Sequence, residues 1–177
     1  KSVEKIVEDI KRVADKILED IKRSEDRVRE IVDRHRREID KVVKEIVKRV
    51  EDLKRNNIPR EEAERVLRDV ERKVEEINRR MEEHLRKLEE EVKRSHDEIR
   101  RKLEELEKRV RDIKKDVDKD EMEDLKRRVD ELKKEIERAL KEHKDKVKKL
   151  LDDLRRLNEE LRREVRRVLE EVRETTR

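Results

Sequence analysis

The chain contains no cysteine, no glycine and no aromatic residue, and it has one proline among 177 residues. Without cysteine it has no disulfide framework, no thiolate nucleophile and no cysteine-based zinc site. Without glycine it lacks the phosphate-cradling loops and the dinucleotide-binding fingerprint that depend on that residue. Without aromatic residues it has nothing to stack on bases. These absences remove the recognition signals of several classes of cofactor, metal and nucleic-acid site.

Long hydrophobic runs are missing as well. No apolar stretch approaches the ~20 residues that a helix needs to span a bilayer, and the N-terminal segment has no signal-peptide core. We therefore expect no membrane partner, and the localisation stays unassigned. Lysine and arginine number 57 and aspartate and glutamate 53, interleaved along the chain, so we expect no nucleic-acid partner either.

What the chain does contain is apolar residues at helical spacing. Charged residues make up 62% of the sequence and hydrophobic residues 30%, a composition that by itself favours disorder. The hydrophobic residues nevertheless follow an 18-residue repeat, which equals five turns at 3.6 residues per turn. In the first third, the repeat falls on Val3, Ile6, Ile10, Ala14, Ile17, Ile21, Ser24, Val28, Val32, His35, Ile39, Val42, Ile46, Val50 and Leu53. This period predicts long, nearly straight α-helices.

The same repeat continues through residues 63–113 and 122–172, which divides the chain into three helices of matched length. Short connections make neighbouring helices antiparallel. The apolar residues of the repeat form a stripe along each helix, which three helices can enclose and two would leave partly exposed. The sequence thus predicts an all-α, up-down-up three-helix bundle that forms a single elongated domain over 1–177. The expected bounds are about 2–55, 59–116 and 121–175 for the helices, with turns at 56–58 and 117–120.

Two turns separate these helices. At the first, Asn56 and Asn57 can adopt the left-handed conformation that ends a helix, and Pro59 suits the first position of the next one. The second turn lacks glycine and proline. There Asp120 opens a candidate capping box and Asp118 is a rival N-cap. The competing hypothesis is one uninterrupted helix from Pro59 to the C-terminus.

Five positions of the repeat are polar, namely Ser24, His35, Ser95, His143 and Asn158. Folding the chain at both turns places His35 level with residues 79 and 159, and His143 level with residues 95 and 19. We therefore predict two polar core layers, which consist of His35, Asn78 and Asn158, and of Ser24, Ser95 and His143 with His96 adjacent. Buried polar groups are costly unless they are hydrogen-bonded, so such layers would penalise wrong registers. The alternative is that these residues are substitutions tolerated at the edge of a narrow core.

Catalytic and metal-binding interpretations of these side chains are weaker. A catalytic pair of Ser95 and His143 needs an open pocket and an oxyanion hole, for which a glycine-free helical bundle supplies no obvious source. A metal site from His96 and His143 with Asp97 or Glu142 lacks the i,i+4 histidine spacing of helical zinc sites. We expect no enzyme activity, no catalytic residue, no metal ligand and no cofactor.

In these features the sequence resembles de novo designed, parametrically generated single-chain helical bundles that carry buried hydrogen-bond networks. The resemblance covers all 177 residues and implies a stable monomeric scaffold with no natural activity and no required partner. Two alternatives stay open. One is a self-association or partner-helix module that makes contact through Val7, Val43 and Val47. The other is a pH-responsive bundle in which burial lowers the pKa of His35 and His143.

Overall fold

The computed structural model describes residues 3–113 and 117–175. Within them the chain forms three helices, α1 (Val3–Arg55), α2 (Arg60–Asp112) and α3 (Lys119–Thr175), and no strand. The helices contain 53, 53 and 57 residues. The predicted all-α three-helix bundle is confirmed.

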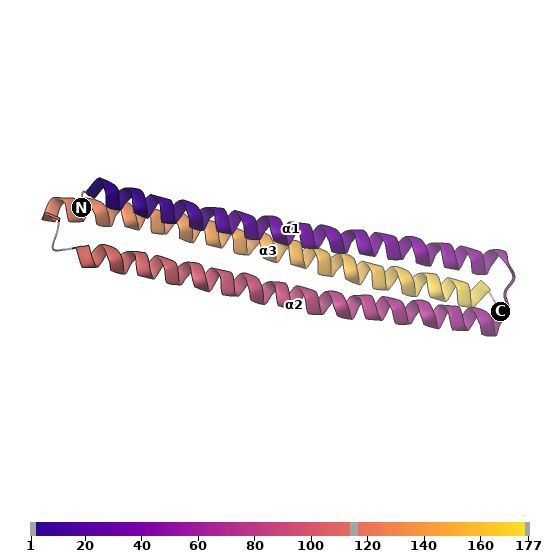
Figure 1. The fold of residues 1–177 in the computed structure, drawn as a ribbon. Coiled ribbons are helices and arrows are strands. Elements are labelled where there is room, and N and C mark those ends of the chain that lie inside the picture. Colours follow the sequence, from indigo (N-terminus) through magenta and orange to yellow (C-terminus); the bar gives the residue numbers. More distant parts are fainter. Residues whose placement is uncertain (1–2, 114–116, 176–177) are drawn as a thin grey trace. The chain divides into compact units, whose positions relative to one another are not determined.

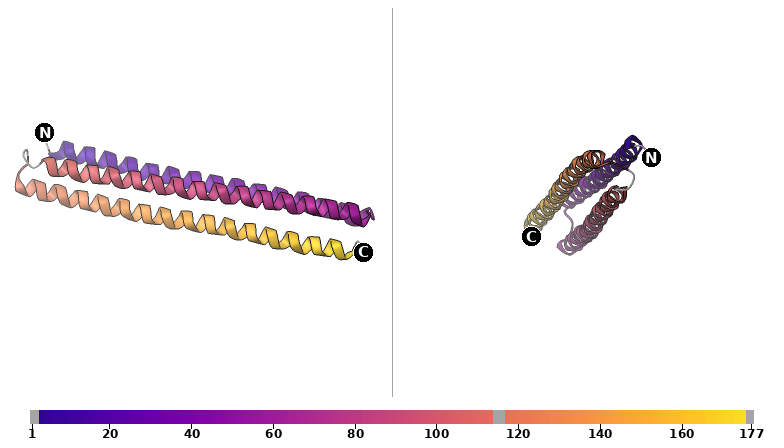
Figure 2. Two further views of the ribbon diagram at one scale, coloured as in Figure 1. Left: turned by 90° about the horizontal axis from the view of Figure 1, so that it is seen from below. Right: turned by 90° about the vertical axis from the view of Figure 1, so that its left-hand side faces the viewer.

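The three helices contribute to two compact units. Unit 1 consists of Lys1–Val28 and Leu88–Lys148, and unit 2 consists of Arg29–Lys87 and Lys149–Arg177. Within each unit, segments of α1 and α3 run in one direction and a segment of α2 runs in the other (Figures 1 and 2). Each unit therefore has the up-down-up arrangement expected from the sequence. The assignment of a single domain over 1–177 stays a prediction.

Two apolar clusters form the core of unit 1. The first contains Val7, Ile10, Leu106, Val110, Met122, Leu125 and Val129. The second contains Ala14, Ile17, Ile21, Ile99, Leu103, Ile136 and Leu140. Each cluster combines residues of all three helices. Because each buried aliphatic side chain contributes about 1.5–3 kcal/mol before conformational entropy is subtracted, these clusters outweigh the surface ion pairs.

Unit 2 has a core of the same kind. From α1 it buries Val32, Ile39, Ile46, Val50 and Leu53; from α2 it buries Ala63, Leu67, Val70, Val74, Met81 and Leu85; and from α3 it buries Leu151, Leu154, Leu161, Val165, Leu169 and Val172. These side chains continue the apolar stripe of each helix. Both units thus depend on the same 3.6-residue spacing that was evident in the sequence.

The buried stripe departs from the 18-residue repeat at a few neighbouring positions. Val7 is buried where the repeat has Ile6, Leu151 where it has Leu150, and Leu169 where it has Val168. The core face of a helix is about 100° wide, which is the angle between two successive residues. Either of two adjacent apolar residues can therefore occupy the central position, and the sequence period alone does not choose between them.

The first turn uses the residues that the sequence marked. Asn57 has φ 44°, in the left-handed region, and the backbone N–H of Asn56 still donates to the carbonyl of Asp52 at 3.2 Å. The carbonyl of Pro59 accepts from the N–H of Ala63 at 3.0 Å, so Pro59 immediately precedes α2. The helix begins one residue later than expected, because proline here supplies the capping carbonyl.

The second turn corrects the expected start of the third helix. α3 begins at Lys119 and not at 121, because Oδ1 of Asp118 accepts from the backbone N–H of Glu121 at 2.9 Å. The N–H of Met122 also donates to the carbonyl of Asp118, at 3.0 Å. Asp118 is therefore the N-cap, and the assignment to Asp120 was wrong.

The end of α2 also differs from its expected position. The helix ends at Asp112, whereas it was expected to reach 116. The last part of that expectation, residues 114–116, lies outside the described residues, as does residue 2 of the first expected helix. The hypothesis of one uninterrupted helix from Pro59 is wrong, because α2 and α3 are separate antiparallel helices.

Candidate polar core sites

A buried pair of histidines joins α2 to α3 in unit 1. Nε2 of His96 lies 2.7 Å from Nδ1 of His143, within hydrogen-bond distance. The ring centroids are 5.0 Å apart and the planes are tilted by 57°. Only 6% of His96 and 1% of His143 is exposed. Because a neutral imidazole has one N–H and one free nitrogen, one ring of this pair donates and the other accepts.

The surroundings of His96 hold its imidazole in the neutral form. The pKa of His96 is lowered to about 4, mainly by burial and then by the neighbouring His143, Arg100 and Lys144, against a smaller opposing effect of Asp97. Removing a charged ring from water is unfavourable, and nearby cations add to that cost. His96 is therefore uncharged at neutral pH.

His143 is also held neutral, although its neighbours act in opposite directions. Burial lowers its pKa; the carboxylate of Glu25 raises it and the ammonium of Lys146 lowers it. Glu25 and Lys146 form an ion pair with a 3.2 Å N–O distance. The second ring nitrogen of His143, Nε2, is buried and has no hydrogen-bond partner among the described residues.

Ser24 and Ser95 lie at the edge of this region. Both are half-buried, and together with Asp20, Arg23, Arg27, Val28, Leu88, Glu91 and Val92 they line an open hollow of about 460 Å³ between α1 and α2. The core position expected for Ser95 is occupied by His96. The sequence predicted that residue 95 lies level with His143. In the structure, the neighbouring residue His96 contacts His143.

In unit 2, His35 contacts a carboxylate and a second histidine. Nδ1 of His35 lies 3.6 Å from Oε2 of Glu38, and its ring centroid lies 5.4 Å from that of His84. His35 is buried, whereas His84 is exposed. Burial lowers the pKa of His35, and the adjacent Glu38 partly offsets this effect. No hydrogen bond between His35 and Asn158 is present among the described residues.

The two asparagines of unit 2 are buried with unsatisfied polar atoms. Asn78 is 1% exposed and Asn158 is 6% exposed. Nδ2 and Oδ1 of Asn78, and Oδ1 of Asn158, have no hydrogen-bond partner among the described residues. An unsatisfied buried polar group costs about 1–3 kcal/mol. These side chains therefore reduce the stability of the core in which they lie.

The register of α1 against α2 differs from the one expected from the sequence, and the layer of His35, Asn78 and Asn158 stays a prediction. The sequence placed His35 level with residue 79, but its ring packs against His84. Arg27 pairs with Glu91 at 3.4 Å, where residue 87 was expected. Helical side chains lean toward the N-terminus of their own helix. In an antiparallel pair, the two residues whose side chains meet are therefore not the two whose Cα atoms are level. Each contacting residue lies closer to the C-terminus of its own helix.

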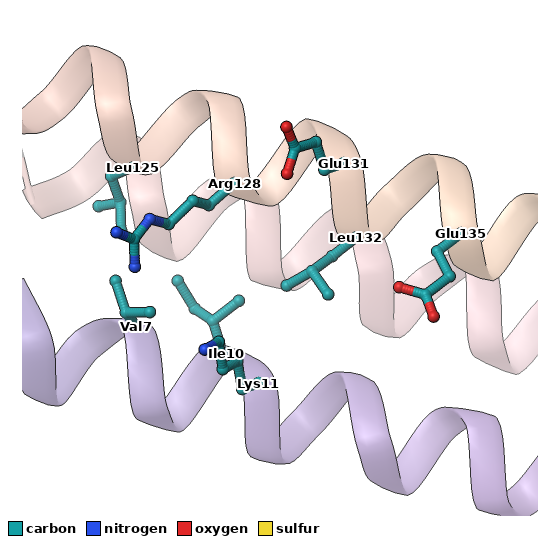
Figure 3. Close-up of a pocket in the computed structure, with 8 residues that line it drawn as sticks. All are labelled: Val7, Ile10, Lys11, Leu125, Arg128, Glu131, Leu132 and Glu135. Atoms are coloured by element: carbon teal, nitrogen blue, oxygen red, sulfur yellow. The ribbon is translucent and has the colours of Figure 1, made fainter.

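A smaller hollow of about 150 Å³ lies between α1 and α3 in unit 1 (Figure 3). Its lining consists of Val7, Ile10, Lys11, Leu125, Arg128, Glu131, Leu132 and Glu135. Figure 3 shows Arg128 reaching toward Val7 while Glu131 points away from α1. The hollow has an apolar floor and a rim of charged side chains.

Two further observations concern ligands and membranes. Over residues 3–113 and 117–175, no three histidine, aspartate or glutamate side chains are grouped so that they could hold a metal ion. Among the helical residues that the structure describes, no helix combines the length and the apolar character needed to cross a membrane.

Comparison with known proteins gives a likeness in structure alone. No protein family matches the sequence, and no curated protein matches it. A solved structure described as a computationally designed three helix bundle superposes with a TM-score of 0.54. The two chains are 20% identical, and the match covers 98% of this chain and 91% of the other. At this identity the likeness shows a shared fold, and it confirms that the chain resembles a designed three-helix bundle.

Proposed function

We propose that this chain is a designed structural scaffold without a natural biochemical activity, in which a buried polar contact sets the register of the helices. The fold that it shares with a computationally designed bundle supports the scaffold assignment. The hydrogen bond between His96 and His143 carries the register assignment, because it links α2 to α3 inside an apolar core.

The apolar stripe by itself discriminates poorly between registers. Since similar aliphatic residues recur at every helical turn, a slide of one turn would replace one set of aliphatic contacts by another. The imidazole pair behaves differently. After such a slide, both rings would be buried against aliphatic side chains without a partner, at a cost of about 1–3 kcal/mol for each unsatisfied group. The native register is thereby favoured over its neighbours.

Carbodiimide cross-linking tests this role because it joins amines to carboxylates that are already in contact. Lys133 lies 2.8 Å from Glu107, and Lys146 lies 3.2 Å from Glu25. We expect both links in the unaltered protein. In the double variant His96→Leu and His143→Leu, we expect an additional link from Lys133 to Glu104, one turn away from Glu107, identified by mass spectrometry.

The matched control is the double variant His35→Leu and His84→Leu. It removes a histidine pair whose rings are in contact without a hydrogen bond between them. We expect this variant to keep the cross-link pattern of the unaltered protein. If the His96 and His143 double variant also keeps that pattern and remains monomeric, the polar pair does not set the register.

The proposed scaffold is monomeric and needs no partner. Among the residues named for self-association, Val7 lies in the core of unit 1, Val43 is half-buried and Val47 is 44% exposed. Sedimentation equilibrium at two concentrations should give 22.0 kDa at both. A larger mass that returns to 22.0 kDa in the variant Val47→Lys would instead support the self-association module.

A pH-responsive bundle is the second candidate function. The observation that favours it is the lowered pKa of both His35 and His143, each caused mainly by burial. A denaturant midpoint that is the same at pH 7 and pH 5 would reject this candidate.

A further inference from the structure

All four histidines of the chain are paired across helices, with one pair in each unit. His96 and His143 pair in unit 1, and His35 and His84 pair in unit 2. The pairs differ in the contact they make. The nitrogens of the first pair form a hydrogen bond inside the core. In the second pair the rings pack together and one of them is exposed to water.

The number of protons on the two rings determines whether the hydrogen bond between His96 and His143 can persist. Two neutral imidazoles carry one N–H each, and one of these protons lies between Nε2 of His96 and Nδ1 of His143. A third proton from the solvent can bind a ring nitrogen that takes no part in this bond and leave the bond intact. A fourth proton must bind the accepting nitrogen of the bond itself. Two N–H groups would then face each other at 2.7 Å between two positive charges, which forces the rings apart.

The charged groups around the pair do not compensate for these additional protons. They come from each helix packed against it: Glu25 from α1, Asp97 and Arg100 from α2, and Lys144 and Lys146 from α3. Both carboxylates already have cationic partners, since Glu25 pairs with Lys146 at 3.2 Å and Asp97 with Arg100 at 3.8 Å. Three cations thus face the pair against two carboxylates.

The pair in unit 2 is better placed to accept protons. Glu38, one turn along α1, holds a carboxylate oxygen 3.6 Å from Nδ1 of His35. The other ring, His84, is exposed to solvent. His84 and Arg34 both lower the pKa of His35, but no imidazole nitrogen of His84 forms a hydrogen bond with the His35 ring.

We infer that the His96–His143 pair is an acid-triggered release between α2 and α3 in unit 1. Protonation of both rings breaks their hydrogen bond and opens this part of the core, whereas the rings of His35 and His84 in unit 2 share no hydrogen bond that protonation could break. The inference rests on the proposed scaffold function, because the contact that sets the register at neutral pH is the one released by acid. Opening exposes the adjacent apolar residues, which include Ile99 and Leu140.

The direction of the pH effect follows from the position of the folded-state pKa. For His96 it lies at about 4, below the unfolded value of about 6.5, so the unfolded chain binds more protons in this range. The stability contribution is complete above pH 6.5 and declines as the pH falls toward 4. For His96 alone, the folding equilibrium constant falls by about 20-fold between pH 7 and pH 5.

Hydrogen exchange at pH 7 and pH 5, corrected for the intrinsic exchange rates, locates the opening. We expect amides around His96 and His143 to lose more protection at pH 5 than those around Ile39 and Leu161 in unit 2. In the variant His96→Leu and His143→Leu, the loss of protection in unit 1 should disappear. In the matched variant His35→Leu and His84→Leu, it should remain.

A second test uses the unaltered protein and therefore does not depend on whether a variant folds. Imidazole ¹⁵N shifts report which ring nitrogens carry protons, and a coupling across the N–H···N bond reports the contact between His96 and His143. We expect this coupling at pH 7 and its loss as the second ring becomes charged. Two charged rings with intact protection in unit 1 would overturn the inference. Because the cross-link pattern is measured at neutral pH, it tests the proposed register role separately.

Discussion

The carboxylate of Asp118 accepts a hydrogen bond from the backbone N–H of Glu121 across 2.9 Å, and this contact begins α3. Replacement of an N-cap aspartate by alanine typically lowers the free energy of unfolding by about 0.5–2 kcal/mol. We expect a loss of about 1 kcal/mol for Asp118→Ala in guanidinium denaturation. Asp120→Ala is the control, because Asp120 lies inside the first turn. An equal loss in both variants would contradict the assignment of the N-cap.

The backbone of Asn57 provides the second prediction. Its φ of 44° is unfavourable by about 1–2 kcal/mol for a residue with an ordinary Cβ and neutral for glycine. Asn57→Ala should therefore lower the free energy of unfolding by about 1 kcal/mol, and Asn57→Gly should leave it unchanged or raise it. Asn56→Ala serves as the comparison. Thermal denaturation followed by circular dichroism measures all three, and a similar loss for alanine at both positions would contradict a special role of Asn57.

The buried asparagines provide the third prediction. Asn78→Leu removes two unsatisfied buried atoms and adds apolar surface of similar volume, so we expect a gain of about 1–3 kcal/mol in the free energy of unfolding. Asn158→Leu removes one such atom and should gain less. If Asn78→Leu is destabilising, the amide of Asn78 must be satisfied in solution.

The histidine pair provides the fourth prediction, which concerns non-additivity. A single replacement of His96 or His143 by leucine leaves the other ring buried without a partner, and we expect each to cost about 1–3 kcal/mol at pH 7. The double variant leaves no unpaired ring, so its cost should be smaller than the sum of the two single costs. Additive effects in this cycle would show that the two imidazoles do not interact.

The three helices and the first turn could be predicted because they depend on local chemistry. The 3.6-residue spacing of apolar side chains determines which face of each helix is buried. The sequence Asn-Asn-Ile-Pro contains a residue that tolerates the left-handed conformation and another that cannot continue a helix. Neither inference requires knowledge of distant contacts.

The composition of the polar sites was harder to predict because it depends on small rotations of the helices and on their register. His96 follows Ser95 by 100° around the helix, and either could face the core. The displaced pairing of α1 with α2, which brings His35 to His84, depends on the lean of side chains and on the geometry of the turn. Apolar periodicity carries no information on either quantity.

The placement of one histidine pair in each unit has a spectroscopic consequence. Since the chain has no phenylalanine, tyrosine or tryptophan, the imidazole protons of His35, His84, His96 and His143 provide its only aromatic proton resonances. Two of these rings lie in each half of the fold. One uncrowded region of a proton spectrum therefore reports on both halves at once, in the intact chain and without an attached probe.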